Sequence, residues 1–423
     1  MKKISRRNLL VGGATAAGAG MLGLHSTLHA ATDRGSKNLI IVVASGGWDT
    51  TYSLDPKPGV GSIDAPVGDI EELGGIPVFT DASRPAARAL FDNHAAITTV
   101  VNGLTVQSLV HTDCAKRVMT GTPSDTAPDF GAITANELGR DLPAPYLVLG
   151  QTSFSGPYAS IATRAGTANQ VGTLLDPARA FPPESGDFSP RFVPDSAEAA
   201  LIRAHVLARA QREKALRGIV GVNESRYRDF IESLARGDEL AATADFGGFD
   251  YTLDLGVQSQ IALDVLEQGI SRVVQMEIGG FDTHDNNAFQ AVKQDELFAG
   301  LAALIDELAA RDGADAGSKM LDETVVVVVS EMGRTPLLND ALGKDHWPVT
   351  SAMILGGGTS GGRVLGATTD AFLSEPMNLK TGELDDGGGQ LGYSNFAAGL
   401  LNLVGVDAAE YLPGAEAFDA LCV

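Results

Sequence analysis

Long, mostly continuous apolar runs recur along this chain, and they constrain its fold more than any other feature. Several are rich in β-branched residues, and a glycine or an acid closely follows each one. Strands read in this way when helices cover both faces of a parallel sheet, because neither face then needs polar side chains. Six runs are predicted to be strands: 38–44, 96–101, 145–149, 271–278, 323–329 and 351–355.

Helical patterns lie between these runs. Residues 287–310 place their leucines close to a 3.6-residue period, and 115–119 is a shorter helical stretch. The alternation of strand and helix predicts a doubly wound α/β fold, with a mostly parallel sheet sandwiched by helices. The charged region 195–244 lacks any strand signal and predicts a helical insertion or lid at about 190–245. We expect one domain over 31–423, with the glycine-rich loops of 356–395 near its site.

The charge balance excludes several classes of partner. The 423 residues hold 53 acids and 31 Lys or Arg, for a net charge of −22. Nucleic acid requires a basic surface, and an anionic membrane face would repel this chain. The two cysteines, Cys114 and Cys422, form neither a disulfide framework nor a zinc ribbon. A redox role also lacks support, because neither a haem motif nor a dinucleotide fingerprint is present in the sequence.

The amino terminus predicts an exported protein. Basic residues precede the mildly apolar run 9–24, which is too short to span a bilayer comfortably. The sequence 5–10, Ser-Arg-Arg-Asn-Leu-Leu, is typical of a twin-arginine signal, and we expect removal of residues 1–30. The mature chain shows no later membrane span. We therefore expect a soluble periplasmic or secreted protein, carried in folded form by the twin-arginine translocase.

One short pattern occurs twice. Gly-Gly-aromatic-Asp-Thr stands at 46–50 and again at 279–283, each time directly after a predicted strand. The glycines permit a sharp turn, and an aspartate then projects at the carboxyl end of the strand. Ligands bind at that edge in open α/β sheets. Asp49 and Asp282 are therefore expected at one edge of the sheet.

Three of the seven histidines lie beside acids in short motifs: His111, His284 and His346. Asp282 and His284 are two residues apart, so in an extended turn they point the same way. Glu331 follows the strand 323–329, and Asp345-His346 comes shortly after it. Two of these histidines, His284 and His346, are expected to converge on one edge of the sheet with five carboxylates, where they could form a metal site. The carboxylates are those of Asp49, Asp282, Asp285, Glu331 and Asp345.

Mixed carboxylate and imidazole ligands suit Zn²⁺, Mn²⁺ or a similar ion. Ligands from several strand ends also suit a two-metal site that clamps both oxygens of a displacement. Arg334, in the same region, could bind an anionic group through its guanidinium, or form an ion pair within an acid-rich loop.

These motifs, in this order, resemble a family of twin-arginine-exported proteins of unknown function within the alkaline phosphatase and sulfatase superfamily. The matching segments cover nearly the whole mature chain: the signal, 46–49, His111 with Thr120-Gly121, 280–284, 330–334, 345–346 and 356–358.

The resemblance implies an alkaline phosphatase-like fold that holds two divalent metals, zinc or manganese, or one calcium. Asp49 would then be the first-strand ligand, Asp282 and His284 the middle pair, and His346 the late histidine. Glu331 departs from the Asp-His pair that the superfamily shows at this point. The implied metal ligands are Asp49, Asp282, His284, Glu331, Asp345 and His346.

The resemblance also implies a nucleophile near a helix that leads to Thr120-Gly121. Ser108 is the first candidate and Thr112 the second, and the helix dipole would assist either. His111, which lies between them, is counted with them as a candidate catalytic residue. The implied activity is an exported, metal-dependent hydrolase of phosphate or sulfate esters, with Arg334 holding the anion. The alternative is a non-catalytic exported protein that keeps the fold and binds an envelope glycan or a partner.

Overall fold

A computed structural model describes residues 37–165, 171, 194–218, 221–242 and 252–422. The predicted signal, 1–30, and parts of 190–245 lie outside the described residues. An eight-stranded sheet forms the centre. Its strands, in spatial order, are β12 (Arg363–Leu365), β4 (Thr98–Thr105), β11 (Val349–Gly356), β8 (Thr324–Val329), β1 (Asn38–Ala44), β7 (Val273–Ile278), β5 (Tyr146–Val148) and β6 (Ala162–Arg164).

All neighbouring strands of this sheet run parallel except β11, which is antiparallel to both β4 and β8. Each of the six predicted runs overlaps a strand of this sheet, and 38–44 coincides with β1. The mostly parallel sheet is thus confirmed.

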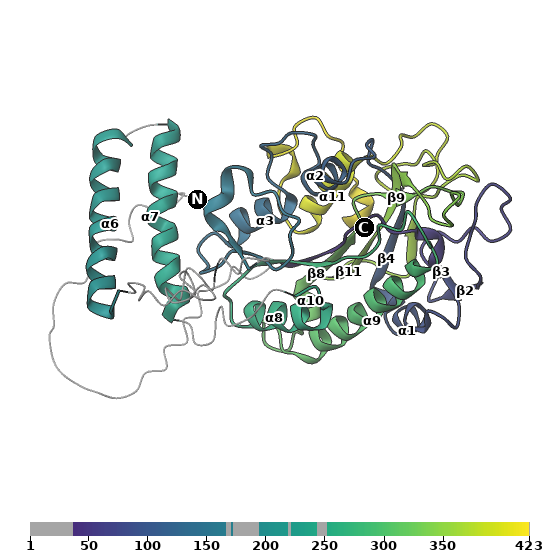
Figure 1. Ribbon diagram of the computed structural model, residues 1–423, viewed down its shortest axis with the longest axis horizontal. Coiled ribbons are helices and arrows are strands. Elements are labelled where there is room, and N and C mark those ends of the chain that lie inside the picture. The colour runs from purple at the N-terminus through teal and green to yellow at the C-terminus, as the bar shows by residue number, and fades with distance from the viewer. Residues whose placement is uncertain (1–36, 166–170, 172–193, 219–220, 243–251, 423) are drawn as a thin grey trace, which may run out of the picture.

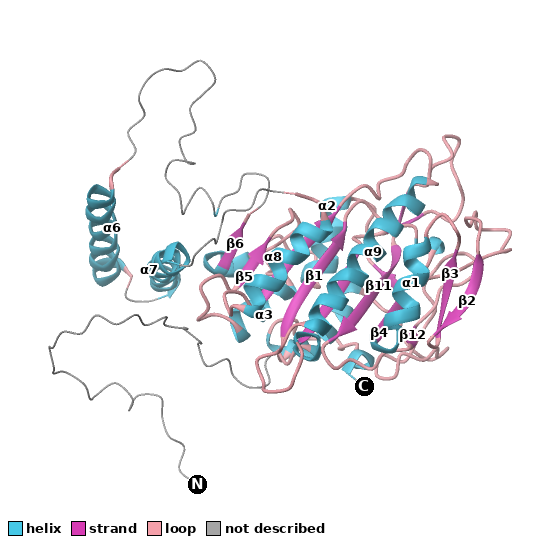
Figure 2. Ribbon diagram, turned by 90° about the horizontal axis from the view of Figure 1, so that it is seen from below, coloured by secondary structure: helices cyan, strands magenta, loops and turns pink. Residues whose placement is uncertain are grey.

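Helices cover both faces of the sheet (Figures 1 and 2). One face carries α1 (Pro85–His94), α8 (Leu255–Glu267), α9 (Phe289–Ala310) and α10 (Met320–Glu323). The other carries α2 (His111–Thr120), α3 (Phe130–Leu138) and α11 (Tyr393–Leu403).

Strand β1 shows why its sequence is apolar throughout. Ile40 packs in the cluster that contains Leu301 of α9, whereas Ile41 joins the cluster that contains Phe130 of α3. Successive side chains point to opposite faces of a strand. Both faces of β1 are therefore covered, and all seven of its residues are buried.

Shorter elements surround this core. Strands β2 (Asp69–Leu73) and β3 (Ile76–Thr80) form a separate antiparallel hairpin. Strands β9 (Gly333–Arg334) and β10 (His346–Trp347) pair antiparallel beyond the end of β8. The 3-10 turns are η2 (Thr50–Tyr52), η3 (Ala95–Ile97), η4 (Gly156–Ile161), η5 (Ala408–Glu410) and η6 (Asp419–Cys422).

Two long helices, α6 (Ser196–Arg217) and α7 (Gly221–Ala242), fall within the predicted insertion. Figure 1 shows them side by side and apart from the sheet. Arg140 binds Asp229 and Glu232 of α7, and Arg236 donates to the carbonyl of Ser160 in η4. These contacts attach the pair near the β6 end of the sheet. None of the described helices is both long and apolar enough to cross a membrane.

Candidate metal centre

The carboxyl ends of β8, β1 and β7 meet at one edge, because these strands are adjacent and parallel. The two Gly-Gly turns lie against each other there. The amide of Ser45 donates to the carbonyl of Ile278 at 2.9 Å. Gly46 has φ +117°, and a Cβ on it would lie 2.5 Å from the amide nitrogen of Asp282. Only glycine fits this position, for both conformation and space.

Asp282 lies at the middle of a cluster of three histidines. Its Oδ1 is 3.2 Å from Nε2 of His284 and 3.4 Å from Nε2 of His346. Its Oδ2 is 3.4 Å from Nε2 of His111. The ligand atoms of His111, Asp282 and His346 all lie within 4.8 Å of one another. We call His111, Asp282, His284 and His346 the histidine cluster.

The four residues of the cluster come from three separate places in the fold. Asp282 and His284 follow β7, His346 begins β10, and His111 is the first residue of α2. The pairing of β10 with β9 places His346 opposite Arg334, directly after β8. The sheet edge thus brings together residues that are far apart in the sequence.

Each histidine of the cluster has its Nδ1 held by an acceptor. Nδ1 of His111 is 2.8 Å from Oε1 of Glu331, and Nδ1 of His284 is 2.8 Å from Oδ1 of Asp345. Nδ1 of His346 is 2.7 Å from the carbonyl of Leu109. These partners assign the hydrogen to Nδ1 in each ring, which leaves the Nε2 lone pair facing the cluster. Metal-ligating histidines are oriented by the same kind of contact.

The Nε2 atoms require a cation. Those of His284 and His346 are 2.9 Å apart, and two lone pairs at that distance repel unless an extra proton or a metal ion lies between them. Nε2 of His111 is buried and has no hydrogen-bond partner among the described residues. An unpaired buried polar atom costs about 1–3 kcal/mol. The imidazoles of His111 and His346 and the carboxylate of Asp282 therefore fit an ion such as zinc, with the imidazole of His284 beside them.

The charges around the cluster shift three pKa values. The hydrogen bond to Glu331 raises the pKa of His111 against the opposing effect of burial. Burial acts to raise the pKa of Asp282, but the guanidinium of Arg334 and the histidines outweigh it and lower the pKa. The hydrogen bond from His284 lowers the pKa of Asp345. Both aspartates are therefore carboxylates at neutral pH.

Arg334 links Asp282 of the cluster to the backbone around it. Its guanidinium is fully buried and donates to the carbonyls of Gly46, Gly47 and Lys344. Nη2 also lies 2.6 Å from Oδ1 of Asp282. Of the two roles predicted for Arg334, this geometry fits the ion pair, because the guanidinium has no exposed surface to offer to an anion.

Asp49 lies outside the histidine cluster. Its Oδ1 accepts from the amide and hydroxyl of Thr51, and its Oδ2 accepts from Nδ2 of Asn287 at 2.8 Å. Nζ of Lys344 is 2.8 Å from the same Oδ2, and both side chains are fully buried. The neighbouring Asp285 is exposed. The repeated motif therefore supplies one aspartate to the cluster and one to a buried ion pair.

The two candidate nucleophiles flank His111. Oγ of Ser108 accepts from the amide of Val110 at 3.3 Å, just before α2. Thr112 is the second residue of α2 and is exposed. Burial raises the pKa of the nearby Cys114 to about 11, which keeps it a thiol.

The sequence alone placed His111 with the catalytic residues, whereas the structure places it among the possible ligands. Its position beside an acid, which it shares with His284 and His346, was the available signal. The Leu109 carbonyl that orients His346 gave no signal, because every residue has a carbonyl.

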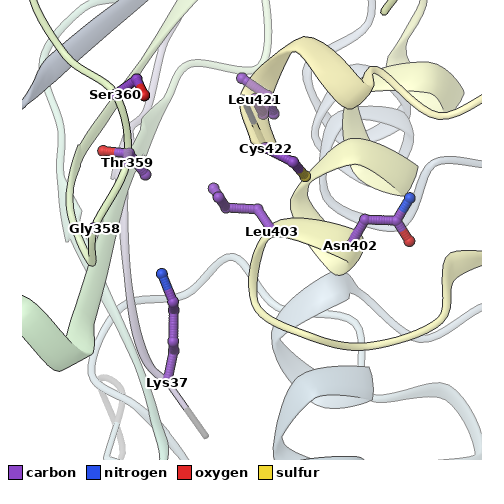
Figure 3. Close-up of a pocket in the computed structure, with 8 residues that line it drawn as sticks. All are labelled: Lys37, Gly358, Thr359, Ser360, Asn402, Leu403, Leu421 and Cys422. Atoms are coloured by element: carbon purple, nitrogen blue, oxygen red, sulfur yellow. The ribbon is translucent and has the colours of Figure 1, made fainter. Parts of the chain in front are cut away.

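A separate cavity of about 280 Å³ lies away from this edge (Figure 3). Lys37 precedes β1, and Gly358 follows the antiparallel β11, so both lie at the amino ends of the parallel strands. The glycines of 356–358 are thus distant from the cluster, contrary to the expectation for 356–395. A later part of that region does approach it, because Nε1 of Trp347 donates to the carbonyl of Phe372. The cavity is lined by Lys37, Gly358, Thr359, Ser360, Asn402, Leu403, Leu421 and Cys422.

The fold and the cluster define an α/β protein with a candidate metal centre at the carboxyl ends of its parallel strands. Residues 36–381 match the family described as "Protein of unknown function (DUF1501)", and the chain belongs to that family. No curated protein matches the sequence.

Several solved structures are similar in fold. The PsFucS1 sulfatase from Pseudoalteromonas sp. is 11% identical, with 92% of this chain and 72% of that one covered and a TM-score of 0.39. A protein in the alkaline phosphatase superfamily from Vibrio parahaemolyticus is 11% identical, with 90% of this chain and 69% of that one covered and a TM-score of 0.39. The phosphonate monoester hydrolase SpPMH from Silicibacter pomeroyi is 11% identical, with 91% of this chain and 76% of that one covered and a TM-score of 0.36. Similarity at this level assigns neither a substrate nor a catalytic residue to this chain.

Proposed function

We propose that this protein is an exported, metal-dependent hydrolase of phosphate or sulfate esters. One observation carries the proposal: three Nε2 atoms converge on Asp282 while an acceptor holds every Nδ1. His111, Asp282 and His346 would hold the ion, with His284 beside them. Imidazole ligands favour zinc or manganese, because calcium takes oxygen ligands.

A bound divalent ion supplies a Lewis acid that polarises an ester oxygen and lowers the pKa of an attacking group. The residues of the chain do the rest. Glu331 and Asp345 hold His111 and His284 in place, and Arg334 holds Asp282. The hydroxyl of Ser108 or Thr112 would attack the phosphorus or sulfur atom of the ester, and the ester's alcohol would leave with the hydroxyl proton. Water would then cleave the phosphate or sulfate from the side chain, and the amino end of α2 would stabilise the anion through its dipole. Because Arg334 is fully engaged, anion binding rests on the ion and on α2.

The test uses the mature chain stripped of metal and reloaded with Zn²⁺ or Mn²⁺. We expect turnover in a panel of aryl phosphates and aryl sulfates that depends on the ion. The Asp282→Asn variant should lose both ion binding and turnover, whereas Asp285→Asn, an exposed neighbour, should keep both. A wild-type chain that takes up neither ion, or one that takes up an ion and cleaves none of these esters, would refute the hydrolase.

The second candidate is a non-catalytic exported protein that binds an envelope glycan or a partner. The local engagement of Ser108 and the burial of Asp49 with Lys344 favour it, since both withdraw groups that catalysis would use. Full ion occupancy without ester cleavage, together with saturable binding of an anionic glycan, would support it over the hydrolase.

Export itself rests on residues 1–30, which we propose to be a twin-arginine signal. Replacing Arg6 and Arg7 with Lys should leave the protein in the cytoplasm of a host with a twin-arginine translocase. The unaltered chain should reach the periplasm or medium, and equal export of both forms would contradict the proposal.

A further inference from the structure

The repeated motif places Asp49 and Asp282 just beyond the carboxyl ends of two adjacent parallel strands. The side chain of Asp282 is 48% exposed and faces three histidines, whereas that of Asp49 is fully buried and faces Lys344. Two copies of one local sequence thus meet two different partners. The difference needs an explanation, because both aspartates follow the same Gly-Gly turn.

Lys344 is the unusual member of the pair. A fully buried lysine is rare, and removing its partner would leave an uncompensated buried charge. Its Nζ lies 2.8 Å from Oδ2 of Asp49 but makes no hydrogen bond of standard geometry with the described residues. The contact is therefore one of charge. Asn287 and Thr51 occupy the remaining positions around the carboxylate.

We infer that the ammonium group of Lys344 is a built-in cation that neutralises Asp49 in place of a second metal ion. The chain then binds one ion, at the histidine cluster, and Asp49 is a positioning residue rather than a ligand. This inference rests on the proposed metal centre. It concerns the number of ions and the role of Asp49, and is independent of the ester that the site cleaves.

The ion pair positions the cluster through the backbone around Lys344. The amide of Lys344 donates to the carbonyl of Thr283 at 3.0 Å, and its carbonyl accepts from Nη1 of Arg334 at 3.0 Å. The next two residues are Asp345, which orients His284, and His346 of the cluster. Holding the Lys344 side chain against Asp49 therefore also holds the segment that carries Asp345 and His346.

Zinc binding by the full mature chain tests the inference without reference to activity. Elemental analysis after gel filtration should find one Zn²⁺ per wild-type chain, and competition with a chelating indicator gives its affinity. The double variant Asp49→Asn/Lys344→Met removes both charges at nearly constant volume, so no buried charge is left unpaired. It should still bind one Zn²⁺, with affinity weakened about 10–100-fold, as for other groups that orient metal ligands.

The control is Lys319→Met, which breaks an exposed ion pair with Asp312 far from the cluster and should bind Zn²⁺ as the wild type does. Two Zn²⁺ per wild-type chain, one of them lost in Asp49→Asn, would overturn the inference and leave the hydrolase intact. A folded double variant with wild-type affinity would overturn the positioning role. Should that variant not fold, the wild-type stoichiometry still decides between one ion and two. One bound Zn²⁺ without ester cleavage would instead refute only the hydrolase.

Discussion

Glu331 offers a way to separate the geometry of the cluster from its charge. Its side chain is 6% exposed, and its Oε1 accepts from both the amide of Gly46 and Nδ1 of His111, each at 2.8 Å. Glu331→Ala leaves both of these donors without their acceptor. Both donors are only part-buried, so each counts at the low end of the roughly 1–3 kcal/mol for an unpaired buried donor. The free energy of unfolding should therefore fall by about 2 kcal/mol.

Glu331→Gln should behave differently, because an amide oxygen at the Oε1 position can accept both hydrogen bonds. The amide nitrogen would then stand near Oγ of Ser330, which is 3.4 Å from Oε2 in the wild type. Only the charge is lost. A charged hydrogen bond exceeds a neutral one by about 1 kcal/mol, so we expect Zn²⁺ affinity to fall roughly 5-fold. The alanine variant should lose about 10–100-fold, since His111 is no longer oriented.

The assays are urea unfolding of the metal-free chains and Zn²⁺ competition with a chelating indicator. If both stability and Zn²⁺ affinity decrease from wild type to Glu331→Gln to Glu331→Ala, the assignment of Nδ1–H to His111 is supported. Equal Zn²⁺ affinity in all three proteins would refute the reasoning, because the orientation of His111 would then not matter to the ion.

Three further predictions follow from the same geometry. Gly46→Ala should cost at least about 2 kcal/mol in urea unfolding, from its positive φ and the contact with Asp282, whereas Gly269→Ala, with φ +64° and open space, should cost about 1 kcal/mol. The pKa of His111 is raised above its ordinary value of 6.5, so the protonated ring stabilises the metal-free protein through its pairing with Glu331. This stabilisation is complete below pH 6.5 and is lost as the pH rises through the raised pKa. The gap between wild type and Glu331→Gln in urea unfolding should therefore narrow towards alkaline pH, and a widening gap would contradict this. In native protein a thiol reagent should label the exposed Cys422 and spare the buried Cys114; rapid labelling of both would show that α2 opens readily.

Local sequence determined the sheet. Runs such as 324–329 can be buried only between two layers, so their presence predicts covered strands in any arrangement of the chain. The sequence did not reveal that β11 runs antiparallel, because a buried strand has the same composition in either direction. Strands β9 and β10 have two residues each, too few to show any period.

The histidine cluster was only partly visible in the sequence. Acids beside His111, His284 and His346 marked all three as candidates, and the strand ends indicated one edge of the sheet. Which carboxylates face the Nε2 atoms, and which stand behind the rings as Glu331 and Asp345 do, depends on side-chain directions that spacing does not encode.

Asp49 and Asp282 show where sequence stops and tertiary structure begins. The motif around each aspartate fixes the turn and the strand end, since glycine conformation and strand burial are local properties. The partner of each aspartate arrives from elsewhere in the fold: Lys344 at one, and His111 and His346 at the other. The role of each carboxylate depends on the side chains that reach it, and only the packing of distant segments decides which side chains those are.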